Sequence, residues 1–165
     1  SKVGNEQKFI FNKIKRYKPD IVLCHLRKKT SGSLSIKNTQ PFSKGNISFM
    51  HNGTVFFNDV KENDSTILFK KIINGGLENL KGAIQSVERD FKYRAMNSII
   101  SDGSSLIAIK YWNTNYGGKK GMNLKKYYSL LTIKNNFADI VCSEILPSLK
   151  NSRIKNTRNK SFTIL

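Results

Sequence analysis

Hydrophobic and polar positions along the chain switch between helical and extended periods, and they predict a mixture of helices and strands. Residues 5–17 carry apolar side chains on one helical face and basic ones on the other, and Pro19 ends this segment. Residues 20–26 form a continuous apolar run rich in β-branched residues, which is typical of a buried strand. The polar stretch 27–45 predicts a long ordered loop, and loops of that length inside compact domains tend to be functional.

The middle of the chain predicts one further strand and two helices. A strand over 46–50 runs into His51-Asn52-Gly53, and Asn-Gly is a strong turn signal. Asp64 is a good N-cap for a helix that continues to Ile73 and ends at Gly75-Gly76. A second helix is expected over about 77–91.

The last third of the chain is expected to be mainly β. Asp102-Gly103 predicts a hairpin turn, and residues 147–160 are polar and basic, as in a surface loop. The expected strands lie at 96–101, 105–112, 127–134, 138–142 and 161–165. Two helices between two groups of strands predict an α+β domain with stacked antiparallel sheets and helices outside, and 165 residues suit a single domain.

The charge balance adds a possible partner to this picture. Lysine and arginine total 29 against 11 acidic residues, which gives a net charge of +18. Such a field attracts polyanions such as nucleic acid, the ribosome or an anionic membrane surface. The lysines are dispersed along the sequence, however, so the charge is equally compatible with general solubility. No aromatic-plus-basic stacking motif for single-stranded nucleic acid is recognisable in the sequence.

Cysteine and histidine usage argues against metal chemistry. Cys24 and Cys142 lie in apolar runs, where cysteines are usually buried and reduced. With only His25 and His51 besides, no metal-ligand spacing is present, and we expect neither a metal nor a cofactor. No apolar stretch is long enough to span a bilayer and no signal peptide is visible, so a cytoplasmic location without a membrane partner is expected.

A succession of short motifs carries the chemistry. Each is weak alone, because Asn-Gly is commonly a turn and an aspartate before a helix is commonly a cap. The motifs are His25-Leu26-Arg27 with Thr30-Ser31-Gly32, Asn38 to Phe42, His51-Asn52-Gly53, Asn63-Asp64-Ser65, Ser101-Asp102-Gly103 and Ser143-Glu144. Their order and spacing resemble the glutamine amidotransferase domain of class II, the N-terminal-nucleophile type, most closely its stand-alone prokaryotic form.

This resemblance implies a fold and a set of site residues. The implied fold is the four-layer αββα sandwich of the N-terminal-nucleophile hydrolases. The implied substrate is glutamine or a γ-glutamyl compound. Arg27 would pair with its α-carboxylate, with help from Thr30, and Asp64 would hold its α-ammonium group. Asn52 and Gly53 would form the oxyanion hole, where each donor is worth roughly 3 kcal/mol of barrier.

The nucleophile of the family is the thiol of an N-terminal cysteine, activated by its own α-amine, and it forms a glutamyl thioester. Here the first residue is Ser1, and the strands and loop that the family places before the amphipathic helix have no counterpart. We therefore expect residues ahead of Ser1 that supply the cysteine; loss of the nucleophile, or Ser1 as a substitute, are the alternatives. Gln40 stands where the family usually has His, and Thr66 where it usually has Glu.

Three hypotheses about function follow. The first is an amidotransferase or glutaminase whose nucleophile lies upstream, with either simple hydrolysis of the amide or transfer of the ammonia to a partner enzyme. The second is an inactive binding protein of the same fold that uses its charge to associate with nucleic acid or ribosome; it predicts that the basic residues share a face. The third is a structural subunit whose missing strands come from a partner chain.

Overall fold

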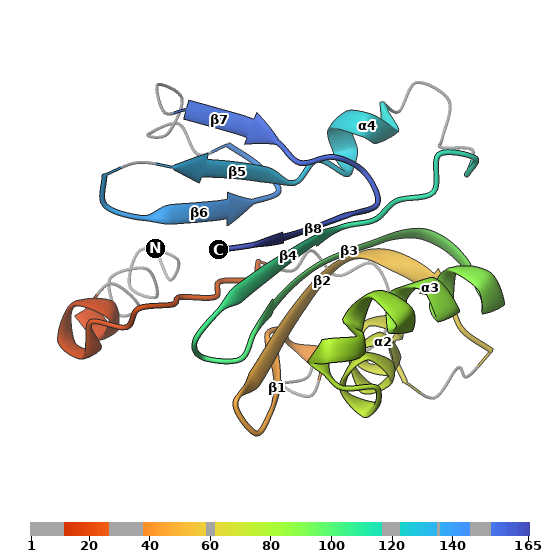
Figure 1. Cartoon of the computed structure of the whole chain (residues 1–165), viewed down its shortest axis with the longest axis horizontal. Helices are drawn as coiled ribbons and strands as arrows, with labels where there is room; N and C mark the ends of the chain where they lie inside the picture. The colour runs from red at the N-terminus through yellow and green to blue at the C-terminus, as the bar shows by residue number, and fades with distance from the viewer. Residues whose placement is uncertain (1–11, 27–37, 59–61, 117–122, 135, 146–152) are drawn as a thin grey trace, which may run out of the picture.

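The computed structural model describes residues 12–26, 38–58, 62–116, 123–134, 136–145 and 153–165. Two antiparallel sheets and two main helices make up this part of the chain (Figure 1). The five-stranded sheet has the order β1 (Phe42–Lys44), β2 (Ile47–Phe56), β3 (Lys92–Ser101), β4 (Leu106–Lys110) and β8 (Ser161–Ile164). The three-stranded sheet has the order β6 (Asp139–Cys142), β5 (Leu131–Lys134) and β7 (Arg153–Asn156).

The helices cover one side of the five-stranded sheet, and the three-stranded sheet lies on its other side (Figure 1). The helices are α2 (Asp64–Asn74) and α3 (Leu80–Asp90), joined by the short 3-10 helix η2 (Leu77–Asn79); a single turn, α4 (Leu124–Tyr127), precedes β5. The predicted α+β class with antiparallel sheets is confirmed. A four-layer sandwich stays a prediction.

The hydrophobic core fills the space between the helices and the five-stranded sheet. Its fully buried side chains include Phe49 on β2, Ile100 on β3 and Ile109 on β4. They pack against apolar residues of the helices, among them Leu68 and Ile72 of α2, and Ile84 of α3. Alternation along each strand points these residues to the helices and their neighbours to the other sheet.

Helix α2 forms where the sequence predicts it, but its cap is one residue earlier. The Oδ1 atom of Asn63 accepts hydrogen bonds from the backbone N–H of Thr66 at 2.8 Å and from the Thr66 hydroxyl at 2.9 Å. Asp64 is the first helical residue and not the N-cap, so its carboxylate is available for other contacts. Gly75 ends the helix, as predicted.

Strand β2 continues through the Asn-Gly pair, so the predicted turn at this point is wrong. Asn52 lies opposite Asn97 and Gly53 opposite Met96, because β3 is as long as β2 and offers a partner along its whole length. The register shifts only after Thr54, at a β-bulge. The strand ladder therefore overrides the turn signal.

Other parts of the prediction are also corrected. Residues 20–26 are not a buried strand: they pair with no described strand, and Cys24 is exposed. An apolar run needs a neighbouring edge before it becomes a strand, and none of the described strands offers one here. Within the expected surface loop, residues 153–156 form β7, where Ile154 lies opposite Ile133 of β5. Residues 12–17 are helical and Asp102-Gly103 joins β3 to β4, both as predicted.

Candidate functional site

His51 on β2 is the buried anchor of the candidate site. Its Nε2 lies 3.2 Å from the carbonyl oxygen of Ala95, which can only accept, so Nε2 carries the proton. Its Nδ1 therefore accepts from the Ser65 hydroxyl at 2.8 Å. Burial lowers the pKa of His51 because it disfavours the charged imidazolium. The negative charge of Asp64 acts in the opposite direction but is the smaller effect. A neutral imidazole thus ties β2 to the first turn of α2.

Asp64 is held at the same junction by backbone groups. Its Oδ2 accepts from the N–H of Val55 at 3.0 Å, and its Oδ1 accepts from the N–H of Ser65 at 2.9 Å. A carboxylate has about four lone-pair sites, so these two bonds leave capacity for a further donor. The half-buried carboxylate is therefore fixed beside the backbone that follows Gly53 and can still bind a cation such as an ammonium group.

Asn52 projects from the opposite face of β2 to His51, because successive side chains of a strand alternate. It is exposed, and its amide forms no hydrogen bond with the described residues. Its cross-strand partner Asn97 is buried, and both ends of its amide are engaged: Nδ2 donates to the carbonyl of Tyr128 at 3.0 Å, and Oδ1 accepts from the N–H of Tyr111 at 2.9 Å. Of the two asparagines, only Asn52 offers its amide to a ligand.

Gly53 is required by close packing and not by an unusual backbone angle. A Cβ atom at this position would lie 2.7 Å from Nε2 of His51 and still closer to the carbonyl of Ala95. Any side chain would therefore push β2 away from β3 or displace the imidazole. The absence of a side chain at Gly53 therefore lets β2, β3 and the imidazole of His51 pack closely at this point.

The structure places Asn52, Gly53 and Asp64 along one short stretch of β2 and its junction with α2. Arg27 and Thr30, the predicted carboxylate ligands, lie outside the described residues, so their convergence with Asp64 stays a prediction. Two further residues support the site through contacts that the sequence does not reveal: Ser65, whose hydroxyl donates to His51, and Gln40, whose Oε1 accepts the backbone N–H of His51. Both stand within the motifs of the sequence, but their contacts with His51 arise only in the folded chain.

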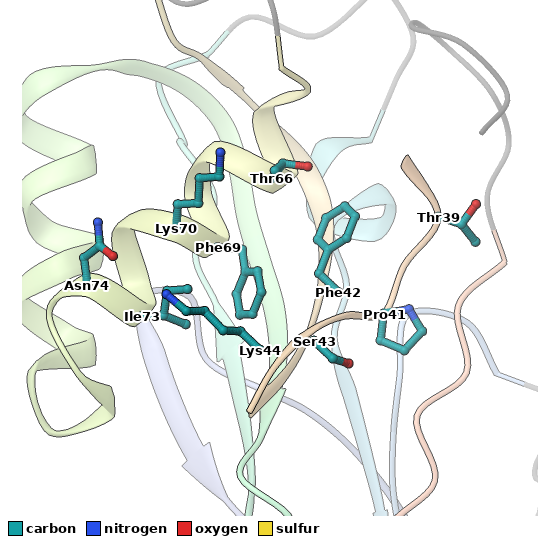
Figure 2. Close-up of a pocket in the computed structure, with 10 residues that line it drawn as sticks. All are labelled: Thr39, Pro41, Phe42, Ser43, Lys44, Thr66, Phe69, Lys70, Ile73 and Asn74. Atoms are coloured by element: carbon teal, nitrogen blue, oxygen red, sulfur yellow. The ribbon is translucent and has the colours of Figure 1, made fainter. Parts of the chain in front are cut away.

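A cleft of about 640 Å³ lies between β1 and α2, next to this junction (Figure 2). Phe42 and Phe69 stack at its base, with ring centroids 6.2 Å apart. Lys44 and Lys70 stand at its rim, and Thr66 brings it close to the start of α2. Asn52, Gly53 and Asp64 do not line it. The cleft therefore belongs to the helix side of the sheet, and Asn52 to the other.

Neither a metal site nor a membrane-spanning helix is present among the described residues. No group of histidine, cysteine, aspartate and glutamate side chains within them could hold a metal ion. None of the helices in this part of the chain is long and apolar enough to cross a membrane.

Comparison with known proteins supports the fold. No family model matches the sequence. The chain is 28% identical to an uncharacterized protein of Methanocaldococcus jannaschii; the match covers 67% of this chain but only 36% of that protein. The structure superimposes on a glutamine aminotransferase class-II domain protein from Silicibacter pomeroyi with a TM-score of 0.54 at 20% identity, covering 79% of this chain and 68% of the other.

A predicted glutamine amidotransferase from Pseudomonas aeruginosa gives a TM-score of 0.47 at 17% identity, too low to support an argument. At sequence identities this low, structural similarity indicates a shared fold and does not indicate a shared activity. The described chain therefore shares the fold of a class II glutamine amidotransferase domain.

Proposed function

We propose that the complete protein is a class II glutamine amidotransferase or glutaminase, and that this chain supplies its glutamine-binding half. The substrate would be glutamine or a γ-glutamyl compound, cleaved through a cysteine thioester. The observation that carries the proposal is the succession of three groups along β2: the exposed amide of Asn52, the adjoining backbone of Gly53, and the Asp64 carboxylate held by the N–H of Val55.

Each group has a defined part in the proposed reaction. The Asn52 amide and the Gly53 N–H would donate hydrogen bonds to the oxyanion of the tetrahedral intermediate, where preorganised donors act most strongly. The Asp64 carboxylate would bind the α-ammonium group, and Arg27 with Thr30 the α-carboxylate. His51 would take no part in proton transfer, because both ring nitrogens are engaged and burial keeps the ring neutral.

The nucleophile of this proposal is an N-terminal cysteine ahead of Ser1, acting with its own α-amine. The two cysteines of the chain suit the role poorly. Burial raises the pKa of the Cys142 thiol, which disfavours the reactive thiolate. Cys24 is exposed, and neither cysteine has a free α-amine beside it. Water would hydrolyse the thioester to glutamate and free the thiol, and the ammonia would be released or passed to a partner enzyme.

Release of glutamate from L-glutamine by the full-length protein tests the proposal. Asn52→Ala should lower kcat by about 100-fold or more, because one oxyanion donor is worth roughly 3 kcal/mol, and should change KM little. Asp64→Asn should mainly raise KM, because the neutral amide binds the α-ammonium group of the substrate less strongly than the carboxylate does. Asn136→Ala, at an exposed turn far along the chain, is the matched control and should behave as wild type.

Equal kcat in wild type and Asn52→Ala would contradict the proposed oxyanion hole. Intact-mass and N-terminal analysis of the natural protein completes the test. It should find a cysteine as the first residue of the mature protein, and a different first residue would contradict the proposed nucleophile.

A further inference from the structure

A cluster of aromatic and basic side chains lies where β2 ends and β3 begins, and it includes residues at the end of α4. We call it the aromatic–basic patch. Its members come from separate parts of the sequence, which is why no stacking motif is recognisable before folding. The patch consists of Phe56, Arg94, Trp112, Tyr116, Tyr127 and Tyr128.

One half of the patch is built around Arg94. The rings of Phe56 and Tyr116 stack with centroids 6.0 Å apart and planes 16° from parallel. The guanidinium carbon of Arg94 lies 5.6 Å from the Phe56 centroid and 5.0 Å from that of Tyr116. A guanidinium group over aromatic faces forms a cation–π contact, which here holds the two rings and the charge together.

The other half is formed by α4 and the residues around the end of β4. Tyr127 meets Tyr128 edge to face at 4.9 Å, and Tyr128 stacks on Trp112 at 6.4 Å. Two hydrogen bonds between Asn159 and the backbone of Trp112 fix the tryptophan. Trp112 pairs with Ala95, and the N–H of Asn113 donates to the carbonyl of Arg94 at 2.9 Å, so backbone contacts place the two halves next to each other.

The patch is open to solvent and positively charged. Phe56 is 41% exposed and Tyr127 is 58% exposed. Contact of such large apolar rings with water is unfavourable, and exposed apolar groups that cluster often mark a binding surface. Exposed lysines flank the rings: Lys92 beside Arg94 on β3, and Lys125 and Lys126 next to Tyr127.

The acidic groups at the adjoining end of α3 are already neutralised. Glu88 accepts from Lys160 at 2.6 Å, and Asp90 pairs with Arg89 at 2.9 Å. The patch therefore presents exposed rings next to cations whose charges are not cancelled by these carboxylates.

We propose that the aromatic–basic patch binds single-stranded nucleic acid. Unpaired bases would stack on the exposed rings of Phe56 and Tyr127, and phosphates would lie near Lys92, Lys125 and Lys126. Stacking on a ring needs a base whose face is free, which a duplex does not offer, and the net charge of +18 favours a polyanion. This function does not depend on the proposed amide chemistry, since it uses other residues.

Fluorescence anisotropy with a labelled oligouridylate of about 12 nucleotides tests the proposal, a length within the site size usual for single-strand binders. Phe56→Ala and Tyr127→Ala should each weaken binding by roughly tenfold, as removal of one stacking ring does, without changing the salt dependence. Lys125→Ala with Lys126→Ala should instead reduce the slope of log K against log salt by about 0.7 for each phosphate that the two lysines neutralise.

Trp112 is the only tryptophan, so its fluorescence reports on the patch directly. Binding of the unlabelled oligonucleotide should quench it to saturation. Phe137→Ala, which removes a ring that is 96% exposed at the β5–β6 turn, and Lys81→Ala on α3 are the matched controls and should leave binding unchanged.

Three outcomes would overturn the proposal: no binding, equally weakened binding in the control variants, or tighter binding of a duplex of the same length. Equal weakening would show that the charge acts diffusely over the surface. Thermal melting of each variant separates a weakened binding surface from an unfolded protein. If the patch binds a protein or a membrane instead, the oligonucleotide should leave the Trp112 fluorescence unchanged, which corresponds to the first of these outcomes.

Discussion

The two faces of β2 and β3 carry different kinds of residue. Toward the helices lie Phe49 and Ile100, fully buried in the hydrophobic core. Toward the other sheet lie Asn52 and Asn97, directly opposite each other. Asn52 is exposed, whereas Asn97 is buried with both ends of its amide hydrogen-bonded. The comparison indicates that the helix-facing side of β2 and β3 is committed to the core at Phe49 and Ile100, whereas the opposite side leaves one amide, that of Asn52, able to bind a ligand.

The largest expected contrast between the faces is in stability. Ile100→Ala should lower the free energy of unfolding by about 2–5 kcal/mol, because it leaves a cavity in a core that cannot fully collapse. Asn52→Ala should change it by less than about 0.5 kcal/mol, because the amide is exposed and bonds to none of the described residues. Urea denaturation of both variants measures the difference. A similar loss of the free energy of unfolding in the two variants would contradict the difference between the faces.

A smaller effect concerns the buried histidine that joins β2 to α2. Because burial lowers the pKa of His51 below 6.5, the unfolded chain takes up a proton at this residue more readily than the folded chain. Its contribution to stability is fully present above about pH 6.5 and is lost as the pH falls toward the lowered pKa. The free energy of unfolding should fall by up to about 1.4 kcal/mol per pH unit in that window.

Urea denaturation between about pH 7.5 and pH 5 measures this dependence. His51→Gln should flatten the pH dependence, since it removes the titrating group, whereas His25→Gln is the control for the other histidine. A pH profile that His51→Gln leaves unchanged would contradict the role given to the Ser65 and Ala95 hydrogen bonds.

The sequence predicts those features that local chemistry determines. The helix after Asn63 has its cap, its apolar face and its terminating Gly75 in a short segment, and Asp102-Gly103 has a strand on either side. The candidate site is predicted from a succession of motifs, and three of its residues lie together on β2 and at its junction with α2. Its support by Ser65 and Gln40 depends on contacts across the fold and could not be inferred from spacing.

The errors arise where tertiary pairing overrides local preference. Asn52-Gly53 favours a turn, yet the long partner strand β3 keeps it extended. Residues 20–26 favour a strand, yet they meet no described edge, and residues 153–156 look like a loop but pair with β5. The aromatic–basic patch is the clearest case, because strand ends, a loop and α4 assemble it from distant segments.

If Asn52, Gly53 and Asp64 serve one ligand with an amino-acid end, the backbone around them should respond to that ligand. Amide NMR shifts of the full-length protein on addition of L-glutamate, the product of the proposed reaction, test this most directly. The N–H groups of Val55 and Ser65 both donate to Asp64 and are therefore sensitive reporters, together with that of Gly53. We expect saturable shifts at these three amides, abolished in Asp64→Asn and absent with D-glutamate. No saturable shift there, or equal shifts with both enantiomers, would contradict a shared ligand site.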